Sequence, residues 1–565
     1  MRFYPKLFSS LRNYNKELFY ADLMAGIIVG IVALPLAIAF GIASGVTPEK
    51  GLFTAVIAGF IISFLGGSKV QIGGPTGAFI VIVYGIVQEF GVTGLAIATM
   101  IAGIMLIAMG LLKLGSVIKF IPYPVVVGFT SGIALTIFST QIKDLFGLQT
   151  GELPGDFLSK WVVYGEFFNT ANFWSLGVGI ISILIIALTP KISKKIPGSL
   201  IAIVLMTAIV YFLRNHFGIS GIETIGDRFT IDASLPKAST PVISFAVIQK
   251  LLPTAFTIAM LGAIESLLSA TVADGVIGDK HNSNTELIAQ GVANVVVPIF
   301  GGIPATGAIA RTMTNINNGG RTPVAGIIHA LVLLLIMLFL GDLTKHIPMA
   351  CLAGVLIIVA YNMSEWRTFK SLMKNSKSDV AVLLTTFLLT VIFDLTIAIE
   401  IGLLLAVFLF MRRMNETSTV SIIKDVVDDA VDDDQVHESE KIIIPAKVEV
   451  YEIEGPFFFG VASKFEETMK QLGDKPKVRI IRMRKVPFID STGSHNLENL
   501  IRMSIKDKTQ VILSGVNEMV FNVLVNVGIE KLVGKQNVCS NINEAIERAK
   551  IIVEEGKNKT VNGKR

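Results

Sequence analysis

The chain reads Ile72-Gly-Gly-Pro-Thr-Gly-Ala-Phe79 inside one long apolar region and Ile303-Pro-Ala-Thr-Gly-Ala-Ile-Ala-Arg311 inside another. Proline removes a backbone donor and glycine weakens a helix, so each segment is expected to run extended and to become helical only near its threonine. Each stretch therefore predicts a membrane segment that is broken part-way, and the shared Thr-Gly-Ala indicates two related halves of the chain.

The composition around these stretches is that of a membrane protein. Of the 565 residues, 52% are hydrophobic and 16% are charged, whereas soluble globular chains are less apolar and more charged. The net charge of +5 is spread between apolar runs, so no nucleic-acid partner is expected. Only Cys351 and Cys539 are present, which implies no disulfide framework. No nucleophile–base pair or metal cluster stands at a usable spacing, so we expect neither an enzyme nor a cofactor.

Apolar runs that are long enough to cross a bilayer recur through the first three quarters of the chain. A full span needs roughly 20 residues, and a broken or re-entrant one needs fewer. We place fourteen spans, at residues 24–44, 52–66, 76–90, 93–112, 122–140, 173–190, 197–213, 248–274, 285–300, 305–317, 324–341, 347–361, 379–394 and 396–411.

Lysines and arginines in short loops predict the orientation of these spans. An even number of spans and cations gathered in alternate loops place both termini in the cytoplasm. We expect a cytoplasmic N-terminal segment over residues 1–20 and a transmembrane domain over 21–413, in the cell (inner) membrane. The loop cations behind this assignment are Lys113, Lys119, Lys191, Lys194, Lys195, Arg321, Arg367, Lys370, Lys374, Lys377, Arg412 and Arg413.

The spans fall into two groups of seven, separated by a polar stretch from Arg214 to Pro241. Because seven is odd, the second group enters the membrane from the opposite side, which is the inverted repeat of many secondary transporters. Two half-helices then present free N–H groups and positive dipole ends to an anion. Each threonine either donates its hydroxyl to that anion or caps its own helix. The expected cradle consists of Thr76, Gly77, Ala78, Thr306, Gly307 and Ala308.

Two ionisable residues are expected inside the membrane, where they are costly and mark functional sites. Glu265 lies in the eighth span with Ser269 one turn further on, so the pair predicts a site for Na⁺ or for a coupling proton. The alternative is a structural carboxylate held by a backbone N–H or by Arg311. Arg311 itself either adds positive charge beside the broken helix, neutralises Glu265, or extends toward the membrane interface.

The remainder of the chain is polar and predicts a second domain. Residues 414–440 form an expected acidic linker, residues 441–556 a small α/β domain, and residues 557–565 a basic tail. Within that domain Asp490-Ser-Thr-Gly493 is typical of a helix start capped by Asp or Ser. The expected strands lie near 447–459, 477–485 and 510–516, with helices between and after them.

Several longer motifs in the chain are shared with a known protein family. The chain contains Leu34-Pro-Leu-Ala-Ile-Ala-Phe-Gly-Ile-Ala-Ser-Gly45 followed by Pro48-Glu-Lys-Gly-Leu52, Gly74-Pro-Thr-Gly-Ala-Phe79, His281-Asn-Ser-Asn284 with Glu286-Leu-Ile-Ala-Gln-Gly291, and Arg311 with Asn315 and Gly319-Gly-Arg321. With these motifs nearly the whole chain resembles the SulP (sulfate permease) family of anion transporters. The tail resembles the STAS domain of that family, and Asp490-Ser-Thr-Gly493 matches its signature turn.

The resemblance implies an all-α membrane domain of fourteen spans in a seven-plus-seven inverted repeat, joined to a cytoplasmic STAS domain. It implies secondary active transport of a sulfate-like inorganic anion coupled to H⁺ or Na⁺, and a homodimer. A core domain of spans 1–4 and 8–11 would move like an elevator against a gate domain of spans 5–7 and 12–14. The substrate pocket carries over to Phe40, Thr76, Gly77, Ala78, Ala308, Ala310 and Arg311, and the coupling site to Glu265 and Ser269.

One departure from the family pattern bears on the substrate. Leu36 follows Pro35 where many sulfate-type relatives place Gln, so this side of the pocket is less polar. Na⁺-dependent transport of bicarbonate or of a C4-dicarboxylate is therefore an alternative. A transporter of neutral nucleobases would share the fold without needing Arg311.

A further alternative concerns the tail. Ser491 falls on the serine that is phosphorylated in anti-sigma-factor antagonists, so it is a candidate regulatory phosphorylation site, and helix capping is its other role. In this reading the chain is a membrane signalling protein whose STAS domain binds a cytoplasmic partner.

Overall fold

The structure is a computed structural model that describes residues 3–116, 121–151, 153–192, 197–219, 221–230, 238–239, 245–393, 395–423, 426–428, 441–458 and 476–562. The chain divides into two compact units, Met1–Ala406 and Val407–Arg565, and each is described by itself. Much of the expected acidic linker (424–425 and 429–440) and residues 563–565 of the expected basic tail lie outside the described residues.

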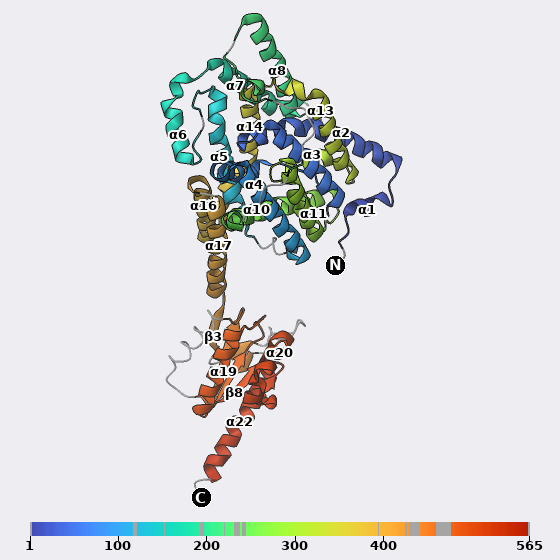
Figure 1. Cartoon of the computed structure of the whole chain (residues 1–565). Helices are drawn as coiled ribbons and strands as arrows, with labels where there is room; N and C mark the ends of the chain where they lie inside the picture. Colours follow the sequence, from blue (N-terminus) through green and yellow to red (C-terminus); the bar gives the residue numbers. More distant parts are fainter. Residues whose placement is uncertain are drawn as a thin grey trace. The chain divides into compact units, whose positions relative to one another are not determined.

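The first unit is helical (Figure 1). Its first half contains α1 (Lys6–Leu11), α2 (Lys16–Ala43), α3 (Pro48–Leu65), α4 (Ile80–Leu111), α5 (Tyr123–Phe146), α6 (Phe157–Glu166), α7 (Phe173–Ile192) and α8 (Gly198–Phe217). Its second half contains α9 (Ile225–Arg228), α10 (Phe245–Ile277), α11 (Ser283–Val296), α12 (Ile309–Asn317), α13 (Val324–Thr344), α14 (Met349–Met363), α15 (Trp366–Leu372), α16 (Lys377–Ile392) and the first part of α17 (Leu395–Thr417).

In the described part of the chain, nine helical segments are long and apolar enough to cross a membrane. One of them, Gly77–Leu111, covers two of the expected spans, which meet at Gly91, where φ is 66° and the helix is kinked. The helices α11, α12 and α16 are shorter and lie where further spans are expected. The fold class is confirmed as a polytopic helical unit, and the count of fourteen spans stays a prediction.

The helices pack in two groups. The first group joins α2, α3 and α4 to α10, α11, α12 and α13, and the second joins α5, α7 and α8 to α14 and α16. Small residues allow close packing within the first group: a Cβ on Gly103 of α4 would lie 2.7 Å from the Gly291 carbonyl oxygen of α11. Such small-residue contacts are typical of helices that associate within membranes, because they let the two backbones approach.

The second unit is a small α/β fold. Its five-stranded sheet has the order β3-β6-β7-β8-β9, with β3 (Thr419–Ile423) antiparallel to β6 (Val448–Glu454). The strands β7 (Val478–Arg482), β8 (Gln510–Ser514) and β9 (Val538–Cys539) continue the sheet in parallel. Two of these strands were not predicted, and β3 lies inside the range expected as linker, so the sheet begins before residue 441. The helices are α19 (Ser491–Lys506), α20 (Glu518–Val527), α21 (Ile529–Val533) and α22 (Ile542–Asn562).

Candidate functional site

The two Thr-Gly-Ala stretches meet as a pair of short strands. The strand β1 (Gly73–Gly74) runs antiparallel to β2 (Thr306–Gly307), with Gly73 opposite Gly307 and Gly74 opposite Thr306. The Ala308 N–H extends the pairing by donating to the Ile72 carbonyl at 2.8 Å. The structure therefore brings together the two segments that the sequence singled out, and their directions are opposite.

Both strands lead directly into helices. After β1 the chain forms a short 3-10 turn, Gly77–Phe79, that continues into α4, and after β2 the helix α12 starts at Ile309. Helix N-termini carry unpaired N–H groups and the positive end of the dipole. Two such ends beside one pair of strands form an environment that favours an anion.

Glycine is required where these strands approach other groups. A Cβ on Gly307 would overlap the amide of Gln71, and a Cβ on Gly74 would overlap the Arg311 guanidinium. Gly74 also has a φ of 152°, which favours glycine. We call the paired strands β1 and β2 the crossing. The glycines allow close approach there, whereas larger side chains would displace the polar groups around it.

Neither threonine caps its own helix, so the capping alternative is wrong. The Thr76 hydroxyl donates to Glu265 Oε2 at 2.7 Å, and the Thr306 hydroxyl donates to the Gly262 carbonyl at 2.8 Å. Both partners lie on α10, one turn apart. The two threonines therefore fasten the crossing strands to the helix that carries Glu265.

Arg311 is 2% exposed, so it does not extend toward the interface. Its Nη2 donates to the Pro75 carbonyl, and its Nη1 is buried without a hydrogen-bond partner. Among the described residues no ion pair within 4.0 Å joins it to Glu265, and the two groups still interact electrostatically, so neutralisation of that carboxylate stays a prediction. A buried guanidinium with an unused donor beside two helix N-termini is a strong arrangement for recognising an oxyanion.

The remaining predicted residues take different positions. Ser269 donates to the Thr312 hydroxyl at 3.4 Å, and that same oxygen accepts the Ile72 N–H at 3.0 Å, so Ser269 supports the start of β1.

Phe40 is buried on α2, whereas Ala310 is exposed on α12. Gly77 faces α14, since a Cβ there would lie 2.8 Å from Met363 Sδ.

Sequence reasoning assigned no role to Glu286, which holds the segment before β1. Its carboxylate is fully buried; Oε2 accepts the N–H groups of Gly67 at 2.8 Å and Ser68 at 3.1 Å. Its Oε1 accepts amide N–H groups from Gln71 at 3.1 Å and Gln290 at 2.9 Å. A carboxylate at the start of an apolar helix is the signal that could have revealed this anchor.

A comparable anchor holds the segment before β2. Asn294 exchanges two hydrogen bonds of 2.8 Å with the backbone of Ala305, and the Ile303 N–H donates to the Thr54 hydroxyl at 2.7 Å. Extended backbone inside a membrane protein must be paired in this way, because no water is available to it.

In the second unit, Ser491 is exposed at the start of α19. The cap of that helix is Asp490, whose Oδ1 accepts the Gly493 N–H at 2.6 Å. Capping by Ser491 is therefore wrong, and its hydroxyl is left accessible.

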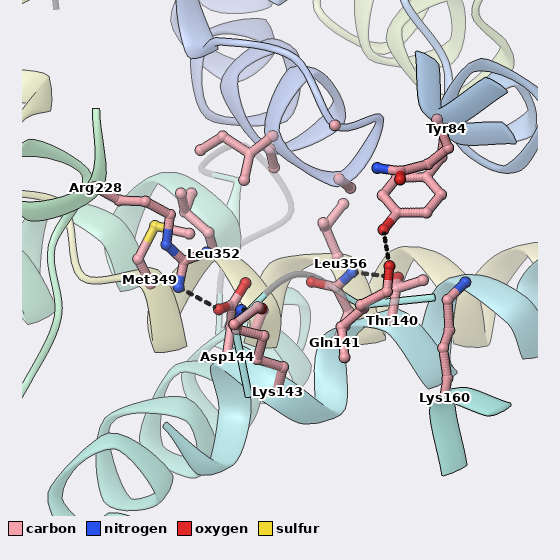
Figure 2. Close-up of a pocket in the computed structure, with 18 residues that line it drawn as sticks. Tyr84, Thr140, Gln141, Lys143, Asp144, Lys160, Arg228, Met349, Leu352 and Leu356 are labelled. Atoms are coloured by element: carbon pink, nitrogen blue, oxygen red, sulfur yellow. Dashed lines mark hydrogen bonds and ion pairs between the residues drawn. The ribbon is translucent and has the colours of Figure 1, made fainter. Parts of the chain in front are cut away.

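A cavity of about 250 Å³ lies among residues of α2, α4, α5, α6, α9 and α14, apart from the paired strands. Figure 2 shows Arg228 and Asp144 on one side of it and Tyr84 and Lys160 on the other. The sequence analysis did not single out any of these residues. We refer to it as the Lys160 cavity, defined by Tyr84, Gln141, Lys143, Asp144, Lys160 and Arg228.

The sequence profile of the sulfate permease family matches residues 19–386, which is most of the helical unit. The chain belongs to the sulfate permease family. The profile of the STAS domain matches residues 441–545 of this sulfate permease family member. The resemblance inferred from the motifs is thereby confirmed, and with it the assignment to a family of multi-pass anion transporters.

Relatives of this sulfate permease family member carry names with two substrates. YvdB of Bacillus subtilis, named as a candidate sulfate transporter, is 40% identical over 542 residues, covering 94% of this chain and 98% of YvdB. The bicarbonate transporter BicA of Picosynechococcus is 33% identical over 514 residues, covering 87% of this chain and 88% of BicA.

Solved structures agree with the fold. The transmembrane domain of a cyanobacterial bicarbonate transporter BicA has a TM-score of 0.61 at 32% identity, covering 70% of this chain and 98% of that domain. The structure of SLC26A9 has a TM-score of 0.86 at 19% identity, covering 98% of this chain and 93% of SLC26A9, a likeness of fold alone.

Proposed function

We propose that this protein is a secondary active transporter of a small inorganic oxyanion, which it binds at the crossing of β1 and β2. The observation that carries the proposal is the buried Arg311 guanidinium, whose Nη1 has no partner, beside the N-termini that follow both strands. Sulfate or a sulfate-like anion is the first candidate substrate. Arg311 also argues against a neutral nucleobase, which needs no buried cation.

Bicarbonate is the second candidate, and two observations favour it. The BicA relatives are named bicarbonate transporters, and Leu36 follows Pro35 where many sulfate-type relatives place Gln, from which we infer a less polar pocket. A smaller, singly charged anion is easier to bind with one guanidinium than a dianion is, because fewer donors are needed to replace its hydration. A C4-dicarboxylate stays the third candidate.

Glu265 is the proposed coupling group, taking up H⁺ or, with Ser269 nearby, binding Na⁺. Its support is the Thr76 hydrogen bond, which links the carboxylate to the first turn after β1. Occupation of Glu265 by a cation would change the donor that Thr76 offers at the anion site. The anion and the coupling ion would thus favour the same state of the protein.

The packing of the helices in two groups supports a core domain that moves against a gate domain, as an elevator does. We further propose a homodimer in the cell membrane, with both termini and the STAS domain in the cytoplasm. As the family is one of anion transporters, we infer transport without an enzymatic activity. Exposed Ser491 would let phosphorylation change what a cytoplasmic partner binds.

The test is uptake of labelled sulfate, bicarbonate and succinate into proteoliposomes under imposed Na⁺ or pH gradients. Accumulation of an inorganic anion against its gradient supports the proposal, and the gradient that drives it identifies the coupling ion. Absence of flux for all three, with phosphorylation of Ser491 altering partner binding, would instead support the signalling role.

A further inference from the structure

Lys160, on the short helix α6, is a charged side chain in an unusual place. It is 2% exposed, although lysine is almost never fully buried unless it is paired. Its Nζ donates to the Gly155 carbonyl at 3.0 Å and lies 5.0 Å from the centre of the Tyr84 ring. Among the described residues, no carboxylate lies within 4.0 Å of this ammonium group. A buried cation in contact with only a carbonyl and an aromatic face, with Asp156 acting on it from beyond 4.0 Å, is only partly compensated.

The Tyr84 ring is fixed in place. Its hydroxyl donates to the Leu153 carbonyl at 2.8 Å, which ties α4 to the segment that leads into α6. The ammonium and the ring are therefore held together at one side of the Lys160 cavity (Figure 2).

The other charged residues of the cavity are already bound to other groups of the chain. Arg228 pairs with Asp144 at 2.7 Å and with Glu223, so its own charge is already balanced. Lys143 donates to the Gly151 carbonyl and also lines the cavity. Asp144 is the single carboxylate among the described lining residues and is paired with Arg228, and Gln88 and Gln141 add amides.

The cavity is large enough for a ligand of this charge. Its volume is about 250 Å³. One water molecule takes about 30 Å³ of liquid, so the space accommodates an oxyanion with several waters still around it. The cavity also lies beside a predicted pocket residue in the sequence, since Ala39 and Ala43 line it from the C-terminal half of α2 and flank Phe40.

We propose that the Lys160 cavity binds a small oxyanion at a second site, separate from the crossing of β1 and β2, where the anion waits before it moves to Arg311. The site rests on the proposed transport function, and in the proposed orientation it lies at the outer end of α2. Lys160 supplies the charge, and the amide and hydroxyl groups of the cavity replace part of the anion's hydration.

Transport from one side tests the proposal. Uptake of labelled sulfate and bicarbonate by intact cells samples the outer side alone, and inside-out vesicles sample the inner side. Lys160→Gln removes the charge at similar length and is expected to raise the outer KM about tenfold, the effect of one lost charge-assisted hydrogen bond. Its maximal rate and its inner KM stay within about twofold of wild type, and Lys160→Arg restores the outer KM. Lys250→Gln, on an exposed residue of α10, makes the same charge change and leaves both KM values unaltered.

Equilibrium binding gives a readout that does not depend on transport. The purified Arg311→Gln protein, which keeps Lys160, is expected to bind one sulfate per chain, and adding Lys160→Gln removes that binding. An Arg311→Gln protein that binds no sulfate, or an outer KM unchanged by Lys160→Gln, overturns the second site. Failure of the proposed function looks different, because wild-type protein then transports none of the tested anions while Lys160-dependent binding persists.

Discussion

The Thr76 hydroxyl and the Glu265 carboxylate share a hydrogen bond of 2.7 Å, which joins the first turn after β1 to the middle of α10. Glu265→Gln preserves an acceptor for Thr76 but removes the charge that would attract H⁺ or Na⁺. We expect gradient-driven accumulation to fall roughly tenfold or more, while passive exchange of labelled anion continues. Both are measured in proteoliposomes. Thr76→Ser, which keeps the hydroxyl, is the matched control, and undiminished accumulation by Glu265→Gln would rule out its coupling role.

Substitutions of Arg311 test whether the anion is recognised by the planar set of guanidinium donors or by positive charge alone. Arg311→Lys keeps the positive charge but loses the planar set of donors that reaches the Pro75 carbonyl and leaves Nη1 unused. The expected result is a KM raised about tenfold with the maximal rate less affected, and a larger loss for Arg311→Gln. Arg12→Lys, an exposed exchange of the same type, serves as the control. Equal KM values for wild type and Arg311→Lys would contradict recognition by the planar set of donors.

Gly307 is expected to tolerate no Cβ. Gly307→Ala would overlap the Gln71 amide, which is held by Ser266 at 2.8 Å and by Glu286 at 3.1 Å. Transport should drop by about tenfold or more, since the crossing must shift. Gly85→Ala, where the added Cβ meets nothing within 4 Å, should be silent. Pairing Gly307→Ala with Gln71→Ala frees the space, and failure of that pair to recover any activity would mean that the clash is not the cause.

Glu286 is expected to matter for stability more than for selectivity. Glu286→Gln turns one acceptor into a donor in front of the Gly67 and Ser68 N–H groups or the two glutamine amides. One unsatisfied buried group costs about 1–3 kcal/mol, so the detergent-solubilised protein should unfold at a temperature several degrees lower. Substrate preference between sulfate and bicarbonate should not change. A normal unfolding temperature with an altered preference would instead place Glu286 in the binding chemistry.

Affinity for outer sulfate at the Lys160 cavity is expected to fall at alkaline pH. Burial lowers the pKa of the Lys160 ammonium below the usual 10.5, an effect that Asp156 partly opposes. The group is charged below its pKa and neutral above it, so affinity for outer sulfate is full at lower pH and is lost as pH rises through that pKa. Tyr84, Lys143, Asp144 and Arg228 also face the cavity. Lys160→Arg should shift the loss of affinity to higher pH. An identical pH profile in both proteins would mean that the titration of Lys160 does not cause the loss.

The sequence predicted the site's segments better than its contacts. Proline and glycine in an apolar run are local signals, so the breaks before Thr76 and Thr306 could be placed, and inverted halves implied that they meet. Which atoms meet depends on packing across distant helices, so the bond from Thr76 to Glu265, the hydrogen-bond partners of Glu286 and the Lys160 cavity could not be predicted. Strand β9 has two residues and β3 lies beside an acidic run, so neither carries a periodic signal.

Pairing of β1 with β2 also has a consequence for biosynthesis. Gly73 and Gly74 leave the ribosome long before Thr306 and Gly307, and until then their ladder partners do not exist. An unpaired backbone group in hydrocarbon is unfavourable by several kcal/mol, so the nascent first half needs water, lipid headgroups or an insertion factor around this segment. The proposed anion site is thus assembled late, and a nascent chain arrested before residue 306 should expose β1 to proteases.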